Sequence, residues 1–157
     1  GRATLDRELG GDVDVSWNAA LKVWIVQQGD TAEALRGRDG PVCGVELTQD
    51  GPRAVIAQQD GSLTCRALRE RVRQSEMSGH EGGVTAVSLT RNAEYAVSTS
   101  VDRTLRMWHA ADGKEIASFA GDVPFTACCI TCGGETVIGG DQEGRVCFLR
   151  PEDGGVL

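Results

Sequence analysis

Residues 79–120 read GHEGGVTAVSLTRNAEYAVSTSVDRTLRMWHAADGKEIASFA, and this stretch decides the fold. It contains four short runs rich in β-branched or apolar residues, separated by clusters of Gly, Asp and Asn that are typical of turns. These runs are 84–89, 95–100, 104–108 and 115–119. The pattern predicts a meander of four antiparallel β-strands.

The same pattern recurs along the chain at a spacing of 42 residues. Leu105 falls on Leu63 one spacing upstream and on Leu21 two spacings upstream, and at two spacings Trp108 falls on Trp24. A fixed period of about 40 to 45 residues indicates a row of equivalent units that bury their apolar faces against one another. We therefore expect one domain over 1–157. Its units would be 1–36 (truncated at the N-terminus), 37–78, 79–120 and 121–157 (truncated at the C-terminus).

The third unit resembles a repeat of the WD40 family. Gly79-His80 matches the pair that opens such a repeat, Asp102 matches the turn between its second and third strands, and Trp108-His109 stands where the family usually has Trp-Asp. The resemblance implies an all-β fold of four four-stranded antiparallel units, each a blade of a β-propeller. The last unit also resembles the final blade of propellers appended to bacterial NACHT- or NB-ARC-type signalling ATPases.

Four residues with polar groups in the third unit include a Ser, a His and an Asp, the residue types of a hydrolase catalytic triad. The same positions in WD40 repeats form a structural hydrogen-bond chain from Trp through Ser and His to Asp, and the resemblance implies that role for Trp108, Ser98, His80 and Asp102. Hydrolysis would also need an exposed nucleophile and oxyanion donors, which the sequence does not indicate. We therefore expect a protein that is not an enzyme.

The cysteines offer half of a zinc site at most. Cys129 and Cys132 have the Cys-x-x-Cys spacing, but a second pair is lacking from the sequence. Cys128 and Cys129 would point to opposite faces of a strand, where small apolar side chains are wanted. We expect packing rather than metal binding, and no cofactor.

Net charge and composition restrict the classes of binding partner and the cellular location expected for this protein. The net charge of −7 argues against nucleic-acid binding, which relies on clustered Lys and Arg. The apolar runs are too short for a membrane helix. Six cysteines without a secretory leader favour a cytoplasmic location with reduced thiols.

The resemblance implies rings of about seven or eight blades, so four units form part of a ring, about half. Open blade faces seldom persist on a monomer. Two copies could close a ring, further blades could lie in another chain or segment, or four blades could close alone. Self-association through the open faces is therefore expected.

A rigid propeller serves as a docking platform, and we expect a non-catalytic protein-interaction scaffold, the docking or sensing region of a larger signalling protein. The alternative is a free-standing half-propeller that assembles with itself. Trp17 is the most interesting rim residue, although it could simply pack locally. The residues expected to bind a partner are Trp17, Arg38, Asp39, Gln59, Glu81, Val101, Asp122 and Gln142.

Overall fold

A computed structural model describes residues 13–18, 23–28, 31–35, 41–47, 53–67 and 74–151. These residues form antiparallel β-strands joined by turns, which confirms the all-β expectation. The part of the chain that is described contains no helix, and so none long and apolar enough to cross a membrane.

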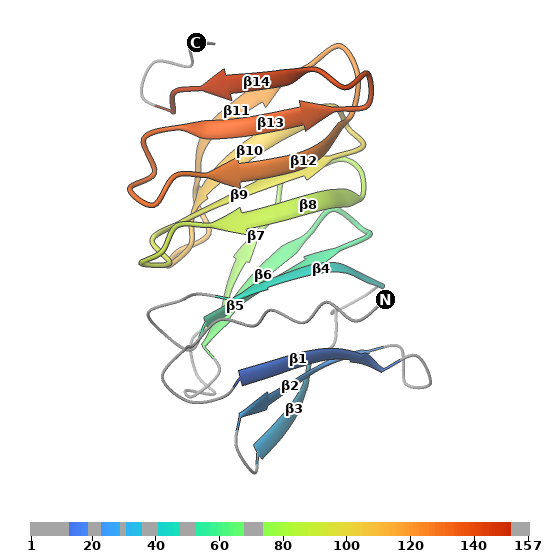
Figure 1. Ribbon diagram of the computed structural model, residues 1–157, viewed down its shortest axis with the longest axis vertical. Helices are drawn as coiled ribbons and strands as arrows, with labels where there is room; N and C mark the ends of the chain where they lie inside the picture. Colours follow the sequence, from blue (N-terminus) through green and yellow to red (C-terminus); the bar gives the residue numbers. More distant parts are fainter. Residues whose placement is uncertain are drawn as a thin grey trace.

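The strands form four sheets, one for each expected unit (Figure 1). The first sheet comprises β1 (Val13–Asn18), β2 (Val23–Gln28) and β3 (Thr31–Leu35). The second comprises β4 (Val42–Leu47), β5 (Arg53–Gln58), β6 (Leu63–Ala67) and β7 (Gln74–Met77). The third comprises β8 (Val84–Leu89), β9 (Tyr95–Ser100), β10 (Thr104–His109) and β11 (Glu115–Ala120). The fourth comprises β12 (Phe125–Ile130), β13 (Val137–Asp141) and β14 (Val146–Leu149).

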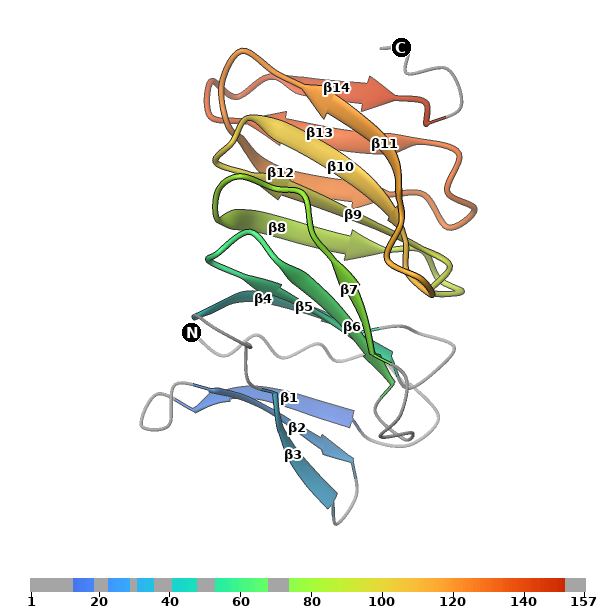
Figure 2. The ribbon, with the colours of Figure 1, turned by 180° about the vertical axis from the view of Figure 1, so that it is seen from behind.

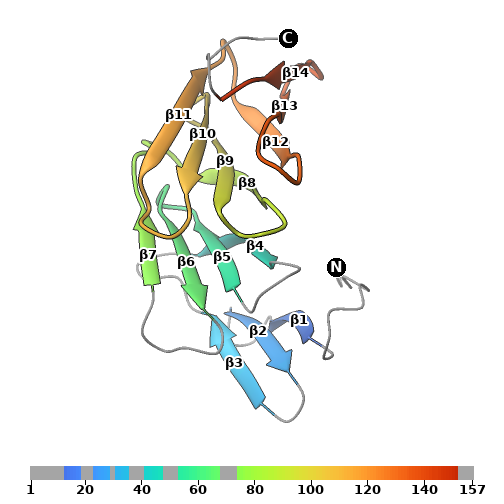
Figure 3. The same ribbon diagram turned by 90° about the vertical axis from the view of Figure 1, so that its left-hand side faces the viewer.

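The sheets stand side by side in an open row rather than a closed ring (Figures 1 and 2). Seen from the side, β7 and β11 lie along one edge of the molecule, whereas β4, β8 and β12 lie toward the other (Figure 3). The first strand of the third sheet, β8, contacts both β4 and β12. This arrangement agrees with part of a β-propeller. That the four units make up about half of a ring stays a prediction.

Two of the four units show all four strands. The first strand of unit one would fall within 1–12, and the fourth strand of unit four would fall after residue 151. Both segments lie outside the described residues, so the four-stranded expectation is met in units two and three.

The hydrophobic core lies between the sheets. One cluster joins Val55, Leu63 and Met77 of unit two to Val84 and Trp108 of unit three. The other joins unit three to unit four, and its members are Val97, Leu105, Met107, Phe119, Phe125, Ile130, Val137 and Leu149. The second strands of units two and three are the most deeply buried, and all of 54–58 and 96–100 are buried.

A β-bulge recurs at the start of the first strand in units two, three and four. The register shifts between Val42 and Gly44, between Val84 and Ala86, and at the same place in β12. In unit three the bulged residue is Thr85, whose hydroxyl donates to the carbonyl of Phe125 at 2.8 Å. The bulge thus turns a side chain of one blade toward the backbone of the next.

Candidate functional site

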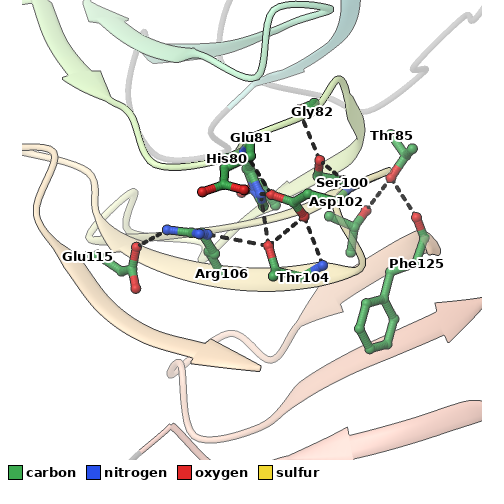
Figure 4. Close-up of polar contacts among 12 residues, drawn as sticks. His80, Glu81, Gly82, Thr85, Ser100, Asp102, Thr104, Arg106, Glu115 and Phe125 are labelled. Carbon is green, nitrogen blue, oxygen red and sulfur yellow. Dashed lines mark hydrogen bonds and ion pairs between the residues drawn. The ribbon is translucent and has the colours of Figure 1, made fainter. Parts of the chain in front are cut away.

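The loops at one end of the blades form the candidate site. Asp102, in the turn between β9 and β10, fastens two of these loops together. One of its carboxylate oxygens accepts from the backbone N–H of Thr104 at 2.8 Å, and the other accepts from the backbone N–H of Glu81 at 3.0 Å. Glu81 belongs to the loop that enters the unit, so one carboxylate holds both rim loops (Figure 4).

A chain of hydrogen bonds connects this turn to the core. Trp108 Nε1 donates to Ser98 Oγ at 2.8 Å, and His80 Nε2 lies 2.8 Å from the same oxygen. His80 Nδ1 lies 2.9 Å from Asp102 Oδ2. The four residues therefore lie in the sequence that the resemblance implies, from a Trp ring between two blades to a carboxylate at the rim.

Burial favours the neutral form of His80. Burial lowers the pKa of His80, and this outweighs the opposing effect of Asp102. A neutral ring can accept the Ser98 hydroxyl proton at Nε2 and donate from Nδ1 to the carboxylate. Burial by itself would raise the pKa of Asp102, but hydrogen bonds from Thr104, His80 and Glu81 hold it well below its usual range. Each donor in the chain then meets an acceptor.

Three further residues extend the network toward the outer strand. The Thr104 hydroxyl donates to Asp102 Oδ1 at 2.7 Å and lies 3.0 Å from His80 Nδ1. Arg106 Nε donates to the Thr104 hydroxyl at 3.3 Å, and its guanidinium pairs with Glu115 on β11 at 2.6 Å (Figure 4). Sequence reasoning missed this extension. The alternation of Thr104 and Arg106 along one strand face was the available signal.

Catalysis by the Ser-His-Asp set has no support in this geometry. Ser98 is fully buried, and its hydroxyl lies between Trp108 and His80. A nucleophile must reach a substrate carbonyl and stand near oxyanion donors. Ser98 does not reach solvent.

Three of the expected rim residues occupy equivalent places. The backbone N–H groups of Gln59, Val101 and Gln142 each donate to the carbonyl just before the first strand of their own unit, at 3.0, 3.1 and 3.1 Å. The three side chains are exposed, and Val101 is 52% exposed. Glu81 and Asp122 are also exposed, in the loops that enter units three and four.

Trp17 does not lie in a rim turn. It lies within β1, in register with Trp24 of β2, so its expected place in the turn between the second and third strands is wrong. The spacing misplaced it because Ser100, the end of β9, falls on Ser16 at a spacing of 84, whereas β1 continues to Asn18. Arg38 and Asp39 lie outside the described residues.

In unit four the turn is capped by Asp141. Its Oδ1 accepts from the backbone N–H of Glu143 at 2.9 Å and of Arg145 at 3.0 Å, and its Oδ2 accepts from Arg145 Nε at 2.7 Å. Unit two uses Asp60, whose Oδ1 accepts from the backbone of Ser62 at 2.9 Å.

Cys128 and Cys129 lie on opposite faces of the last sheet. Burial raises the pKa of the Cys128 thiol to about 12, and its Sγ lies 3.8 Å from the carbonyl of Val97. Cys129 and Cys132 are exposed, and no group of three or more potential metal ligands occurs within the described ranges.

Each four-stranded antiparallel sheet corresponds to one blade of a β-propeller, and neighbouring blades pack face to face with the Trp108 ring between them. Residues 71–109 match the WD40 family, described as WD domain, G-beta repeat. The match spans the end of unit two and most of unit three.

Several curated proteins are similar to this chain, and two of the three described here carry WD in their names. Autophagy-related protein 16 of Arabidopsis thaliana is 26% identical over 140 residues, which cover 88% of this chain and 27% of that protein. The ribosome biogenesis protein WDR12 homolog of Ixodes scapularis is 28% identical over 157 residues, covering 92% and 34%. The uncharacterized WD repeat-containing protein sll1491 of Synechocystis is 32% identical over 96 residues, covering 60% and 27%. The chain therefore spans about a third or less of the length of these relatives.

Proposed function

We propose that this chain is a non-catalytic interaction module whose rim docks a protein partner. The observation that carries the proposal is the exposed Val101, held in a turn whose Asp102 is tied to the core through His80 and Ser98. An apolar side chain on a pre-ordered loop binds with little loss of conformational entropy. The resemblance to WD40 repeats, which implies a docking platform, supports the same proposal.

The finer proposal is that the module forms the docking or sensing region of a larger signalling protein. The resemblance of the last unit to propellers appended to NACHT- or NB-ARC-type ATPases supports it. We also propose a cytoplasmic location, because six free thiols suit a reducing compartment.

The rim proposal is tested by site-specific photo-crosslinking. A photo-reactive amino acid replaces Val101 in one protein and Ile116 in a control, because Ile116 is a similarly exposed apolar residue, 45% exposed, on the outer strand β11. We expect a discrete adduct with another protein from position 101 alone. Equal labelling from both positions, or none from 101, would remove the rim proposal.

A second candidate function is self-assembly into a closed ring. It is favoured by exposed apolar side chains on the last sheet, Val146 and Phe148. Ring closure through them would supply the self-association expected from open blade faces.

A further inference from the structure

We propose that Arg103 selects the partner of the rim by pairing with a carboxylate that this partner carries beside an apolar side chain. Arg103 belongs to the turn between β9 and β10, two residues after Val101. The proposal rests on the rim function proposed above and adds the chemistry of the partner. It starts from the backbone conformation of Arg103, which a residue with a side chain rarely adopts.

Arg103 occupies a position where the equivalent turns carry glycine. Its φ is +70°, and the matching residues of units two and four are Gly61 and Gly144, with φ of +92° and +81°. In each turn this residue donates its backbone N–H to the carbonyl three residues earlier, at 3.2 Å. Left-handed backbone is unfavourable for a residue with a Cβ but costs glycine little. The turn therefore requires the conformation and does not require an arginine side chain.

The Arg103 side chain makes no interaction that accounts for this conformation. The residue is exposed, and its guanidinium makes no ion pair or hydrogen bond with any residue that the structure describes. Its backbone is held on both sides, because the N–H donates to Ser100 and the carbonyl accepts from the N–H of Gly121 at 2.9 Å. An unfavourable conformation kept without an intramolecular contact indicates a residue that serves binding.

Arg103 is the rim cation that a ligand can reach. The described rim loops are 59–62, 78–83, 101–103, 121–124 and 142–145. Their two cationic residues are Arg103 and Arg145, and Arg145 is already paired, with Asp141 at 2.7 Å and with Glu143 at 3.3 Å. A guanidinium binds a carboxylate through two parallel N–H donors, which makes the pair specific in geometry as well as in charge.

Neighbouring carboxylates limit the partner to one negative charge at this place. Glu81 and Asp122 are exposed in the loops on either side of the Arg103 turn, and backbone N–H donors join both loops to that turn. These two groups would repel a polyacidic segment, a phosphate dianion or a nucleic acid. A single Asp or Glu side chain avoids most of this repulsion. Val101, 52% exposed in the same turn, then contacts the apolar neighbour of that carboxylate.

A random peptide library displayed on phage tests the chemistry of the partner. We expect the wild-type protein to enrich peptides with one Asp or Glu next to an apolar residue, and one enriched peptide is synthesised to measure affinity. Arg103→Gly should bind this peptide about 10-fold more weakly. Exchanging the peptide's Asp or Glu for the amide should cost the wild-type protein the same factor. The two changes together should cost no more than either alone.

Two controls separate this role from folding and from the charge of the protein. Arg91→Gly removes another exposed arginine, in the hairpin at the opposite end of unit three, and should leave the affinity unchanged. Arg103→Gly should keep or raise the urea midpoint of unfolding, since glycine takes this conformation in units two and four. A lower midpoint would show that the arginine serves the fold and would overturn the proposal.

The outcomes distinguish this inference from the rim proposal. A wild-type protein that enriches basic peptides, or an Arg103→Gly protein that binds the acidic peptide as tightly as wild type, overturns the role of Arg103 alone. A Val101→Asp protein that binds the selected peptide like wild type, or a wild-type protein that enriches no peptide, removes the rim proposal and this inference with it.

Discussion

Replacing Ser98 with Ala is the sharpest test of the hydrogen-bond chain in unit three. The Ser98 hydroxyl is the meeting point of the chain, because it accepts from Trp108 Nε1 and lies 2.8 Å from His80 Nε2. Ala keeps the size of the residue almost unchanged and removes only this oxygen. The substitution therefore probes hydrogen bonding with little change in packing.

The expected cost follows from the burial of the three groups. Ser98 and Trp108 are 0% and 1% exposed and His80 is 8% exposed, so water cannot replace the lost partner at the indole N–H. A buried polar group left without a partner costs about 1–3 kcal/mol. With one indole donor and one imidazole nitrogen affected, we expect the free energy of unfolding to fall by about 2–4 kcal/mol.

Urea denaturation followed by Trp fluorescence measures this change. Ser118→Ala is the matched control, because Ser118 lies exposed on β11 of the same unit. Its free energy of unfolding should change by less than about 0.5 kcal/mol. In the double variant Ser98→Ala/Trp108→Phe, the unsatisfied donor is gone, so the cost should be smaller than the sum of the two single changes.

A Ser98→Ala protein as stable as the Ser118→Ala control would refute the reasoning. Strictly additive effects of the Ser98 and Trp108 changes would show that the two residues do not act through their shared hydrogen bond.

Three further outcomes are expected. Stability should fall as the pH drops below about 6.5, the ordinary pKa of His, because burial lowers the pKa of His80 in the folded state and the unfolded chain takes up the proton first. The free energy of unfolding should fall again below about pH 3.8, the ordinary pKa of Asp, because the pKa of Asp102 is held low in the folded state. In denaturation curves measured across pH, His80→Gln should remove only the fall that begins near pH 6.5. Thr85→Val should lower the free energy of unfolding by about 1 kcal/mol, because it leaves the carbonyl of the next blade without its donor, and thermal unfolding measures this. Gly113→Ala should cost about 2 kcal/mol or more in the same assay, because Gly113 has φ of +75° and a Cβ there would meet the backbone carbonyl of Glu76.

The sequence predicted the strands of unit three well, because turn residues punctuate runs of β-branched residues there. The order of Trp108, Ser98, His80 and Asp102 came from the resemblance rather than from spacing alone. What the repeat could not predict was local insertion. Trp17 lies inside a strand because β1 continues two residues past the position equivalent to the end of β9.

The sequence also could not predict which side chains make hydrogen bonds to a given turn. A fixed period assigns equivalent positions, but it cannot say which neighbouring carboxylate caps a turn. Asp141 takes that role in unit four because its oxygens reach two backbone N–H groups and Arg145. The extension through Thr104 and Arg106 depends on side-chain conformations, which no periodicity encodes.

The placement of both hydrophobic clusters between blades has a consequence for how this protein folds. A blade cut out alone would retain its ladder of backbone hydrogen bonds but keep almost none of the buried side chains that stabilise it. The smallest autonomous folding piece is then a pair of adjacent blades, and stability should grow stepwise as blades are added. Folding of this chain is in that sense a nearest-neighbour process, propagated from one interface to the next.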